Sequence, residues 1–146
     1  MTTSNRSSGN RFEQEFAEFL DAHGFWAHVM QQNKSGQPAD IIAVKGNYHC
    51  LIDCKVISDW REGFPLRRVE ENQWYAMRRF ERRCGEQGWF ALKVPDGKVW
   101  MLPMRAVETL EQMGASKIPT AEGKCPKLCD DLETWLAYAD NGGRRF

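Results

Sequence analysis

The sequence predicts an α/β fold in which a central, mixed, five-stranded sheet is flanked by helices. The first observation is size: the chain has 146 residues, 42% of them hydrophobic, which suits one domain with a single core. The second is periodicity, because segments with apolar residues at helical spacing alternate with short extended runs. The third is order, since helix, three strands, helix and two strands is typical of a mixed α/β layer.

The N-terminal part predicts a tail and a helix. Residues 1–10 are polar and are expected to form a flexible tail. A helix is predicted over residues 11–23, between a capping Asn10 and Gly24. Its apolar stripe consists of Phe12, Phe16, Phe19 and Leu20.

Three extended segments should follow this helix. The first covers residues 25–31 and leads into a polar, turn-rich loop at 32–38. Residues 39–45 and 48–56 are predicted to pair as antiparallel strands, because the Gly46-Asn47 pair between them is typical of a hairpin turn.

The remaining elements alternate again between helix and strand. They are a helix at 69–84, strands at 89–94 and 99–102, a short helix at about 105–113 and a last helix at about 130–138. We expect a single domain over residues 11–146. Its core would be about 11–113, with a C-terminal helical extension at about 114–146.

Composition excludes some classes of protein. The sequence has no run of about 18 apolar residues, so no membrane-spanning helix is predicted. Five cysteines, an odd number, and a polar N-terminus favour reduced thiols in a cytoplasm. Cys125 and Cys129 could form part of a metal clip, but without a second Cys or His pair nearby we interpret them as small apolar residues.

The charge distribution allows two interpretations. The net charge is zero, which does not by itself favour nucleic-acid binding. The segment from Arg61 to Lys93 is nevertheless rich in basic residues, including Arg78, Arg79, Arg82 and Arg83. These arginines could follow phosphates or could simply be the solvated face of a helix, and charge alone favours the second interpretation.

The predicted hairpin carries the candidate chemistry. Side chains alternate along a strand, so Asp53 and Lys55 should share a face, opposite the apolar Cys50, Ile52 and Cys54. Asp40, on the paired strand, should reach the same place. A carboxylate and an ammonium group in an apolar strand are costly unless they pair or bind something.

Two carboxylates and a lysine fit magnesium-assisted phosphodiester hydrolysis. Hard carboxylate oxygens hold Mg²⁺, which neutralises a phosphate and lowers the pKa of a bound water. The alternative is an Asp53–Lys55 surface pair, since D-x-K is common. Glu13 favours the first interpretation, because it lies at the edge of the apolar stripe and leans toward the sheet.

At this point the chain resembles the PD-(D/E)xK nuclease superfamily, through Glu13, Pro38-Ala39-Asp40 and Asp53-Cys54-Lys55. Residues 9–15 are similar to the start of archaeal-type Holliday junction resolvases, whose first glutamate in this pattern is catalytic. Phe64-Pro65-Leu66-Arg67 and Asn72-Gln73 resemble the bacterial RecU-type resolvases of Gram-positive bacteria and their phages.

The resemblance implies a restriction-endonuclease-like core, a homodimer, branched double-stranded DNA as substrate, and dependence on Mg²⁺ or Mn²⁺. It implies a bacterial or phage-infected host cell. By residue match, the catalytic residues would be Glu13, Asp40, Asp53 and Lys55. Metal ligands would be Asp40, Asp53, the Cys54 backbone carbonyl and Glu13. The DNA contacts would be Arg11, Lys34, Ser35, Trp60, Arg67, Arg68 and Gln73, with Gln73 near the phosphate or the metal-bound water.

The function suggested by the resemblance is resolution of four-way DNA junctions in recombination or phage DNA processing. The alternatives are another nuclease of the superfamily acting on linear or damaged DNA, and a non-catalytic DNA-binding protein. Two departures bear on this choice. Asp53 stands where resolvases more often have glutamate, and the short segment between Asp40 and Asp53 leaves no room for a long projecting stalk.

Overall fold

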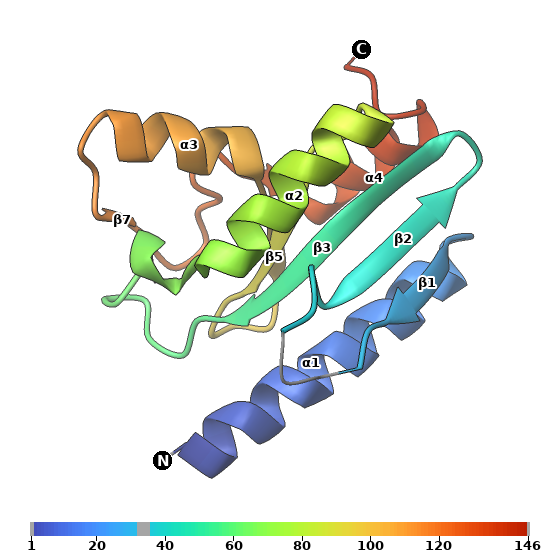
Figure 1. Cartoon of the computed structure of the whole chain (residues 1–146). Helices are drawn as coiled ribbons and strands as arrows, with labels where there is room; N and C mark the ends of the chain where they lie inside the picture. The colour runs from blue at the N-terminus through green and yellow to red at the C-terminus, as the bar shows by residue number, and fades with distance from the viewer. Residues whose placement is uncertain (1, 32–35, 146) are drawn as a thin grey trace.

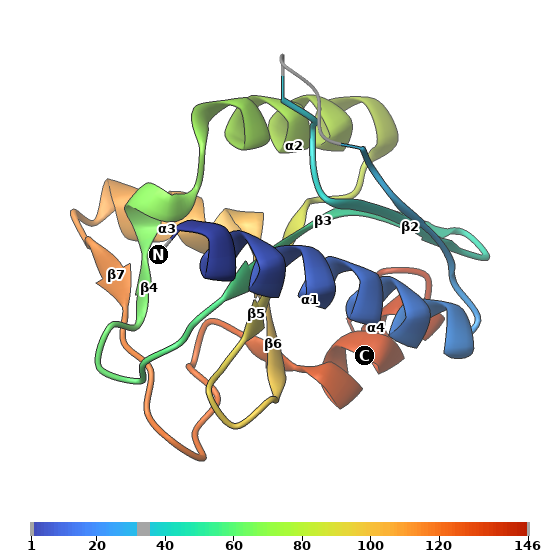
Figure 2. The same cartoon turned by 90° about the horizontal axis from the view of Figure 1, so that it is seen from below.

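The fold is a sheet covered by helices on both faces, as Figures 1 and 2 show for a computed structural model of the chain. The structure describes residues 2–31 and 36–145, with side chains from residue 11 onward. Within these residues the main sheet has six strands in the order β1-β2-β3-β5-β6-β8, and a second sheet pairs β4 with β7.

The helices and strands have the following bounds. The helices are α1 (Thr2–Ala22), α2 (Glu71–Cys84), α3 (Met104–Gln112) and α4 (Leu132–Asp140), with a 3-10 turn at Leu66–Arg68. The main sheet contains β1 (Trp26–Val29), β2 (Ile41–Lys45), β3 (Tyr48–Val56), β5 (Trp89–Lys93), β6 (Val99–Pro103) and β8 (Asp130–Asp131). The small sheet contains β4 (Phe64–Pro65) and β7 (Lys117–Ile118).

The predicted hairpin is confirmed. Strands β2 and β3 are antiparallel, with Ala43 opposite Cys50 and Lys45 opposite Tyr48, so the turn is Gly46-Asn47. Gly46 has a φ of 58°, a backbone conformation that favours glycine. Strand β3 pairs in parallel with β5, and the other neighbours in the main sheet are antiparallel, so the sheet is mixed.

The two faces of the sheet bury separate apolar clusters. On one face, α1 and α4 cover residues such as Ile41, Cys50 and Ile52, with Trp135 of α4 fully buried among them. On the other, α2 and α3 pack on a cluster that includes Leu51. The alternation along β3 is therefore as predicted. It sends odd-numbered side chains toward α2 and even-numbered ones toward α1.

Three expectations about the elements were wrong. The main sheet has a sixth strand, β8, made of two acidic residues that pair with β6. Such a short polar strand lacks the apolar alternation by which strands are found in a sequence.

Helix α4 begins slightly later than the predicted start at about residue 130. It is capped by Asp131, whose carboxylate accepts from the Thr134 N–H at 2.8 Å.

The first helix also begins earlier than expected. It starts at Thr2, so Asn10 lies within it, and residues 2–10 are helical where a tail was expected. The segment contains no proline. Serine and asparagine inside a helix cost only about 0.5 kcal/mol each and glycine about 1 kcal/mol, which the docked apolar stripe can offset.

In the described part of the chain, no helix is both long enough and apolar enough to cross a bilayer.

Candidate active site

Asp53 is the most deeply buried charged residue of the site. Its side chain has no exposed surface, and Lys55, two residues along the same strand, places its Nζ 3.0 Å from Asp53 Oδ2. This oxygen pairs with the Lys55 ammonium but completes no hydrogen bond among the described residues. Burial raises the pKa of Asp53 well above its ordinary value, while the Lys55 charge opposes that rise.

Gln73 holds the other oxygen of Asp53. Its Nε2 donates to Asp53 Oδ1 at 2.9 Å, and its Oε1 accepts the Glu70 N–H at 3.2 Å as part of the capping box that begins α2. The capping bond therefore orients the amide so that its NH₂ group faces Asp53. Gln73, predicted to lie near the phosphate or the metal-bound water, is buried, bonded to the Asp53 carboxylate and part of the wall of the polar cavity described below.

Asp40 is fixed by its backbone as well as its side chain. Its carbonyl accepts from the Met30 N–H at 2.8 Å and its N–H donates to Ile52 at 3.1 Å, which tie it between β1 and β3. Its Oδ2 accepts the Cys54 N–H at 2.7 Å. This bond brings the Asp40 carboxylate to the residue between Asp53 and Lys55.

Glu13 of α1 completes the group of carboxylates. The pKa of Glu13 is raised from 4.5 to about 7, first by burial and then by the charge of Asp40, while the Lys55 charge opposes that rise. Neighbouring carboxylates of this kind gain from a nearby cation. Helix and hairpin thus converge, as the sequence predicted.

These residues surround a small polar cavity of about 190 Å³. Its walls include Glu13, Asp40, Lys55, Glu70, Asn72 and Gln73. Glu70 and Asn72 were not predicted as site residues. The pattern Glu70-x-x-Gln73 is a helix-start signature that could have placed both at the beginning of α2, beside the carboxylates.

The residues present fit a divalent metal ion of the magnesium type. Among the residues that the structure describes, no group of three or more His, Cys, Asp or Glu side chains forms a ready metal cage. Mg²⁺ does not need one, because it is commonly held by one or two carboxylates together with waters and a substrate phosphate. A cation would balance the negative charge of the neighbouring Glu13 and Asp40 carboxylates and of Asp53, whose Oδ2 completes no hydrogen bond among the described residues.

The residues expected to contact DNA differ in how exposed they are. Arg11 and Arg67 are exposed. Arg68 donates to the Val56 carbonyl at 3.0 Å and lies over the Phe64 ring. Trp60 is partly buried against Trp100, with ring centroids 5.8 Å apart. Lys34 and Ser35 lie outside the described residues.

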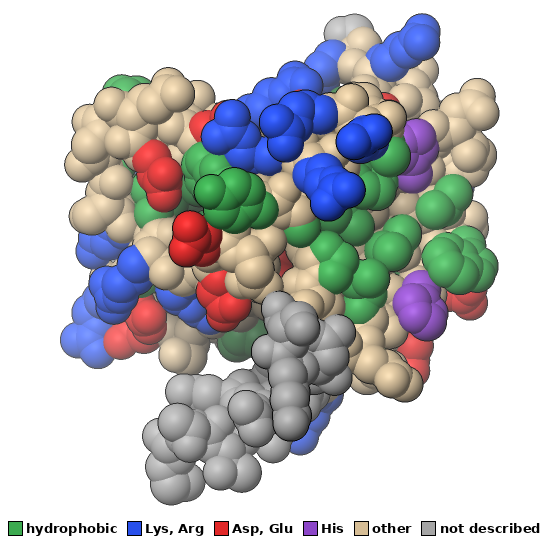
Figure 3. Space-filling model, viewed as in Figure 1, with side chains coloured by type: hydrophobic (Ala, Val, Ile, Leu, Met, Phe, Trp, Pro, Cys, Tyr) green, Lys and Arg blue, Asp and Glu red, His purple; other side chains and the backbone are tan. Residues whose placement is uncertain are grey.

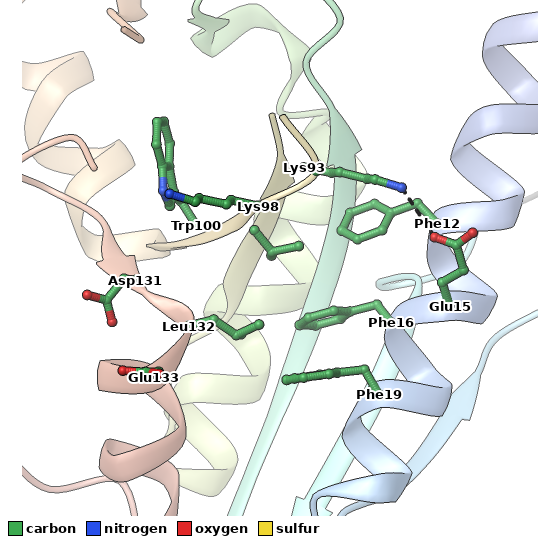
Figure 4. Close-up of a pocket in the computed structure, with 12 residues that line it drawn as sticks. Phe12, Glu15, Phe16, Phe19, Lys93, Lys98, Trp100, Asp131, Leu132 and Glu133 are labelled. Atoms are coloured by element: carbon green, nitrogen blue, oxygen red, sulfur yellow. Dashed lines mark hydrogen bonds and ion pairs between the residues drawn. The ribbon is translucent and has the colours of Figure 1, made fainter. Parts of the chain in front are cut away.

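A second, larger hollow of about 600 Å³ lies between α1, the β5–β6 hairpin and the start of α4. Figure 4 shows Phe16, Phe19 and Leu132 pointing into it. The Lys93 ammonium at its edge is paired with Glu15 at 3.2 Å, so its charge is neutralised by a half-exposed partner. This hollow lacks a buried, incompletely bonded charge.

Comparison with known proteins adds a family. The family model described as archaeal Holliday junction resolvase (Hjc) matches residues 4–132. A solved structure of Hjc from Archaeoglobus fulgidus, a Holliday junction resolvase of an archaeal hyperthermophile, is 24% identical, with a TM-score of 0.52. The similarity covers 65% of this chain and 75% of that chain, and it supports the fold. No curated protein matches the sequence.

Proposed function

Because the chain belongs to the archaeal Holliday junction resolvase family, we propose that it is a metal-dependent endonuclease that cuts four-way DNA junctions by phosphodiester hydrolysis. The observation that carries the chemical part is the buried Asp53 carboxylate, held by Gln73 on one oxygen and facing Lys55 with the other. Lys55 and Gln73, which contact this carboxylate, both line the polar cavity. A buried, incompletely bonded charge directly behind such a cavity is expected where a ligand completes the site.

Asp40, Asp53 and the Cys54 backbone carbonyl would hold the cation, with Glu13 beside them. When bound, Mg²⁺ or Mn²⁺ neutralises charge on the scissile phosphate and makes a water molecule more acidic. The hydrolysis joins the water oxygen to phosphorus and breaks one P–O ester bond. The water gives up a proton, and the departing sugar oxygen takes one up.

The chain's own groups have distinct tasks in this proposal. The Lys55 side chain is 12% exposed and lines the cavity. Its ammonium group would neutralise a phosphate oxygen in the transition state. The Glu13 carboxylate, which lines the cavity beside Asp40, would accept the proton that the water gives up. Gln73 keeps Asp53 Oδ1 occupied, so that Oδ2 faces Lys55 and the cation.

A four-way junction requires two symmetric cuts to be resolved, so the proposal includes a homodimer with one active site per subunit. Sedimentation at micromolar concentration tests this directly. A mass of two chains is expected, and a stable monomer would contradict it.

The central experiment compares a labelled four-way junction with a linear duplex of the same sequence, in Mg²⁺ and in EDTA. We expect paired nicks in the junction, little cutting of the duplex, and none in EDTA. Asp53→Asn, which keeps the size and the Gln73 hydrogen bond, should bind the junction without cutting it.

Two other results would point elsewhere. Equal cutting of the linear duplex would favour a general nuclease of the superfamily. Tight binding with no cutting by the wild-type protein, in either Mg²⁺ or Mn²⁺, would indicate a non-catalytic DNA-binding protein.

A further inference from the structure

Helix α2 presents a strongly basic surface near the cavity. Figure 3 shows Lys and Arg side chains gathered over this helix on the face seen in Figure 1. The residues are Arg78, Arg79, Arg82 and Arg83, all exposed. Together they form what we term the α2 arginine face.

The α2 arginine face is continuous with the active-site cavity. Asn72, in the first turn of α2, lines that cavity. Residues three, four and seven positions apart share one side of a helix, so the side that carries Asn72 continues through Tyr75 to Arg79 and Arg83. Tyr75 is 65% exposed, which leaves an aromatic ring open midway along this row. With a rise of about 1.5 Å per residue, the arginines lie roughly 9–15 Å along the helix from Gln73.

The charges of this face are not neutralised within the chain. None of the four arginines forms an ion pair with residues 11–31 or 36–145. The nearest acid on the same helical segment, Glu81, is already bonded to the Arg105 Nε at 2.9 Å. Of the four, Arg78 alone has its guanidinium over an aromatic ring of a described residue, that of Trp74, 6.0 Å from the ring centroid.

The arrangement also costs stability in the isolated helix. Arg78 and Arg82, like Arg79 and Arg83, are like charges four residues apart, and each such pair destabilises a helix. Favourable interaction with the helix dipole applies to Arg82 and Arg83 in the last turn but not to the other two. An external anion would relieve this repulsion.

We propose that the α2 arginine face binds the backbone phosphates of the duplex arm that leaves the active site. This rests on the proposed function, because the scissile phosphate at the cavity is what sets the arm beside α2. Phosphates on one strand advance about 3.4 Å along the duplex axis, so the contacted phosphates lie roughly three to five nucleotides from the cut. Such contacts are independent of sequence and position the DNA.

The test compares two variants that remove the same charge. One is the triple substitution Arg79→Gln, Arg82→Gln and Arg83→Gln, which spares Arg78 beside Trp74. The matched control replaces the exposed Lys117, Lys124 and Lys127 by Gln, outside α2. Binding of the four-way junction is measured in EDTA over a range of salt concentrations, and cleavage is measured separately in Mg²⁺.

For the arginine variant we expect junction affinity to fall roughly tenfold or more at moderate salt. The slope of log K against log salt should be smaller by about 2–3, corresponding to three lost phosphate contacts. Cleavage at subsaturating DNA should fall with the affinity, and the sedimentation behaviour should remain that of the wild type. The control variant should keep its slope.

An unchanged slope in the arginine variant, an equal loss in the lysine control, or no junction binding by the wild-type protein would overturn the proposal. A change in self-association with unchanged DNA affinity would overturn it too, since it would assign the arginines to an acidic protein surface. If the wild-type protein binds with the expected slope but does not cut, the proposed nuclease function fails while the DNA-binding face stands.

Discussion

Helix α1 borders two hollows of opposite character. Glu13 lines the small cavity with Asp40, Lys55 and Gln73, whereas Phe16 and its aromatic neighbours line the larger hollow beside α4. The larger one is mostly apolar, and its Lys93 is fully paired. The smaller one holds carboxylates with raised pKa values. Size therefore does not identify the chemical site here, whereas incomplete bonding of buried charge does.

The largest expected difference in cleavage is between variants of two lysines, Lys55 at the small cavity and Lys93 at the larger hollow. Lys55→Met should lower junction cleavage on the order of 10²–10³-fold, because it removes a cation aimed at the reacting phosphate. Lys93→Met removes an ion pair whose partner, Glu15, has a 50% exposed side chain, and it should leave cleavage unchanged. Single-turnover cleavage of both variants measures this, and equal losses would erase the distinction.

The second comparison uses two residues of α1 itself. Phe16 is 2% exposed, so Phe16→Ala should reduce the free energy of unfolding by about 3–5 kcal/mol while the folded protein still cuts. Glu13→Gln should do the reverse, with cleavage lost and stability kept. Denaturant unfolding and cleavage below the unfolding temperature separate the two effects. If Phe16→Ala abolished cleavage in fully folded protein, the two hollows would be functionally coupled.

A smaller effect is expected at Gln73, which acts through Asp53. Gln73→Met should lower cleavage by about 10–100-fold, the usual effect of losing a partner that orients a metal ligand. Raising the Mg²⁺ concentration should recover part of the lost cleavage, because weaker metal binding is one cause of the loss. The control is Glu133→Gln, at the edge of the other hollow. This variant should cleave like the wild type, both at the standard and at the raised Mg²⁺ concentration.

The smallest effect is on stability as a function of pH in EDTA. The pKa of Glu13 is raised from 4.5 to about 7, so the folded protein binds more protons than the unfolded chain in that window. Stability should therefore fall as pH rises from about 4.5 to 7. Thermal unfolding of Glu13→Gln should show a shallower fall than the wild type. Parallel curves would mean that Glu13 is already ionised.

Local rules accounted for much of the fold. The Gly46-Asn47 turn predicts the hairpin, and alternation along β3 places Asp53 and Lys55 together, because both depend on residues near in sequence. Strand β8 could not be predicted, since its two residues join the sheet only because β6 offers a free edge.

The site was predicted less completely than the fold. Asp40, Asp53 and Lys55 follow from one hairpin, but the bond from Gln73 to Asp53 joins residues 20 positions apart on different elements. A sequence pattern can indicate that Gln73 begins a helix, but not that the helix lies over β3. The same holds for Arg68, whose hydrogen bond to Val56 depends on the path of the intervening loop.

The hairpin makes the candidate active site sensitive to whether an insertion in its turn has an odd or an even number of residues. Asp53 and Lys55 share the side of β3 toward Gln73 because the odd-numbered residues of β3 face α2. One residue inserted between Gly46 and Asn47 would, if the strand shifted, exchange its two faces and turn an apolar side chain toward Gln73 in place of the Asp53 carboxylate. Two inserted residues would keep the original faces. Whether an insertion is odd or even should therefore matter more to cleavage than its length or composition.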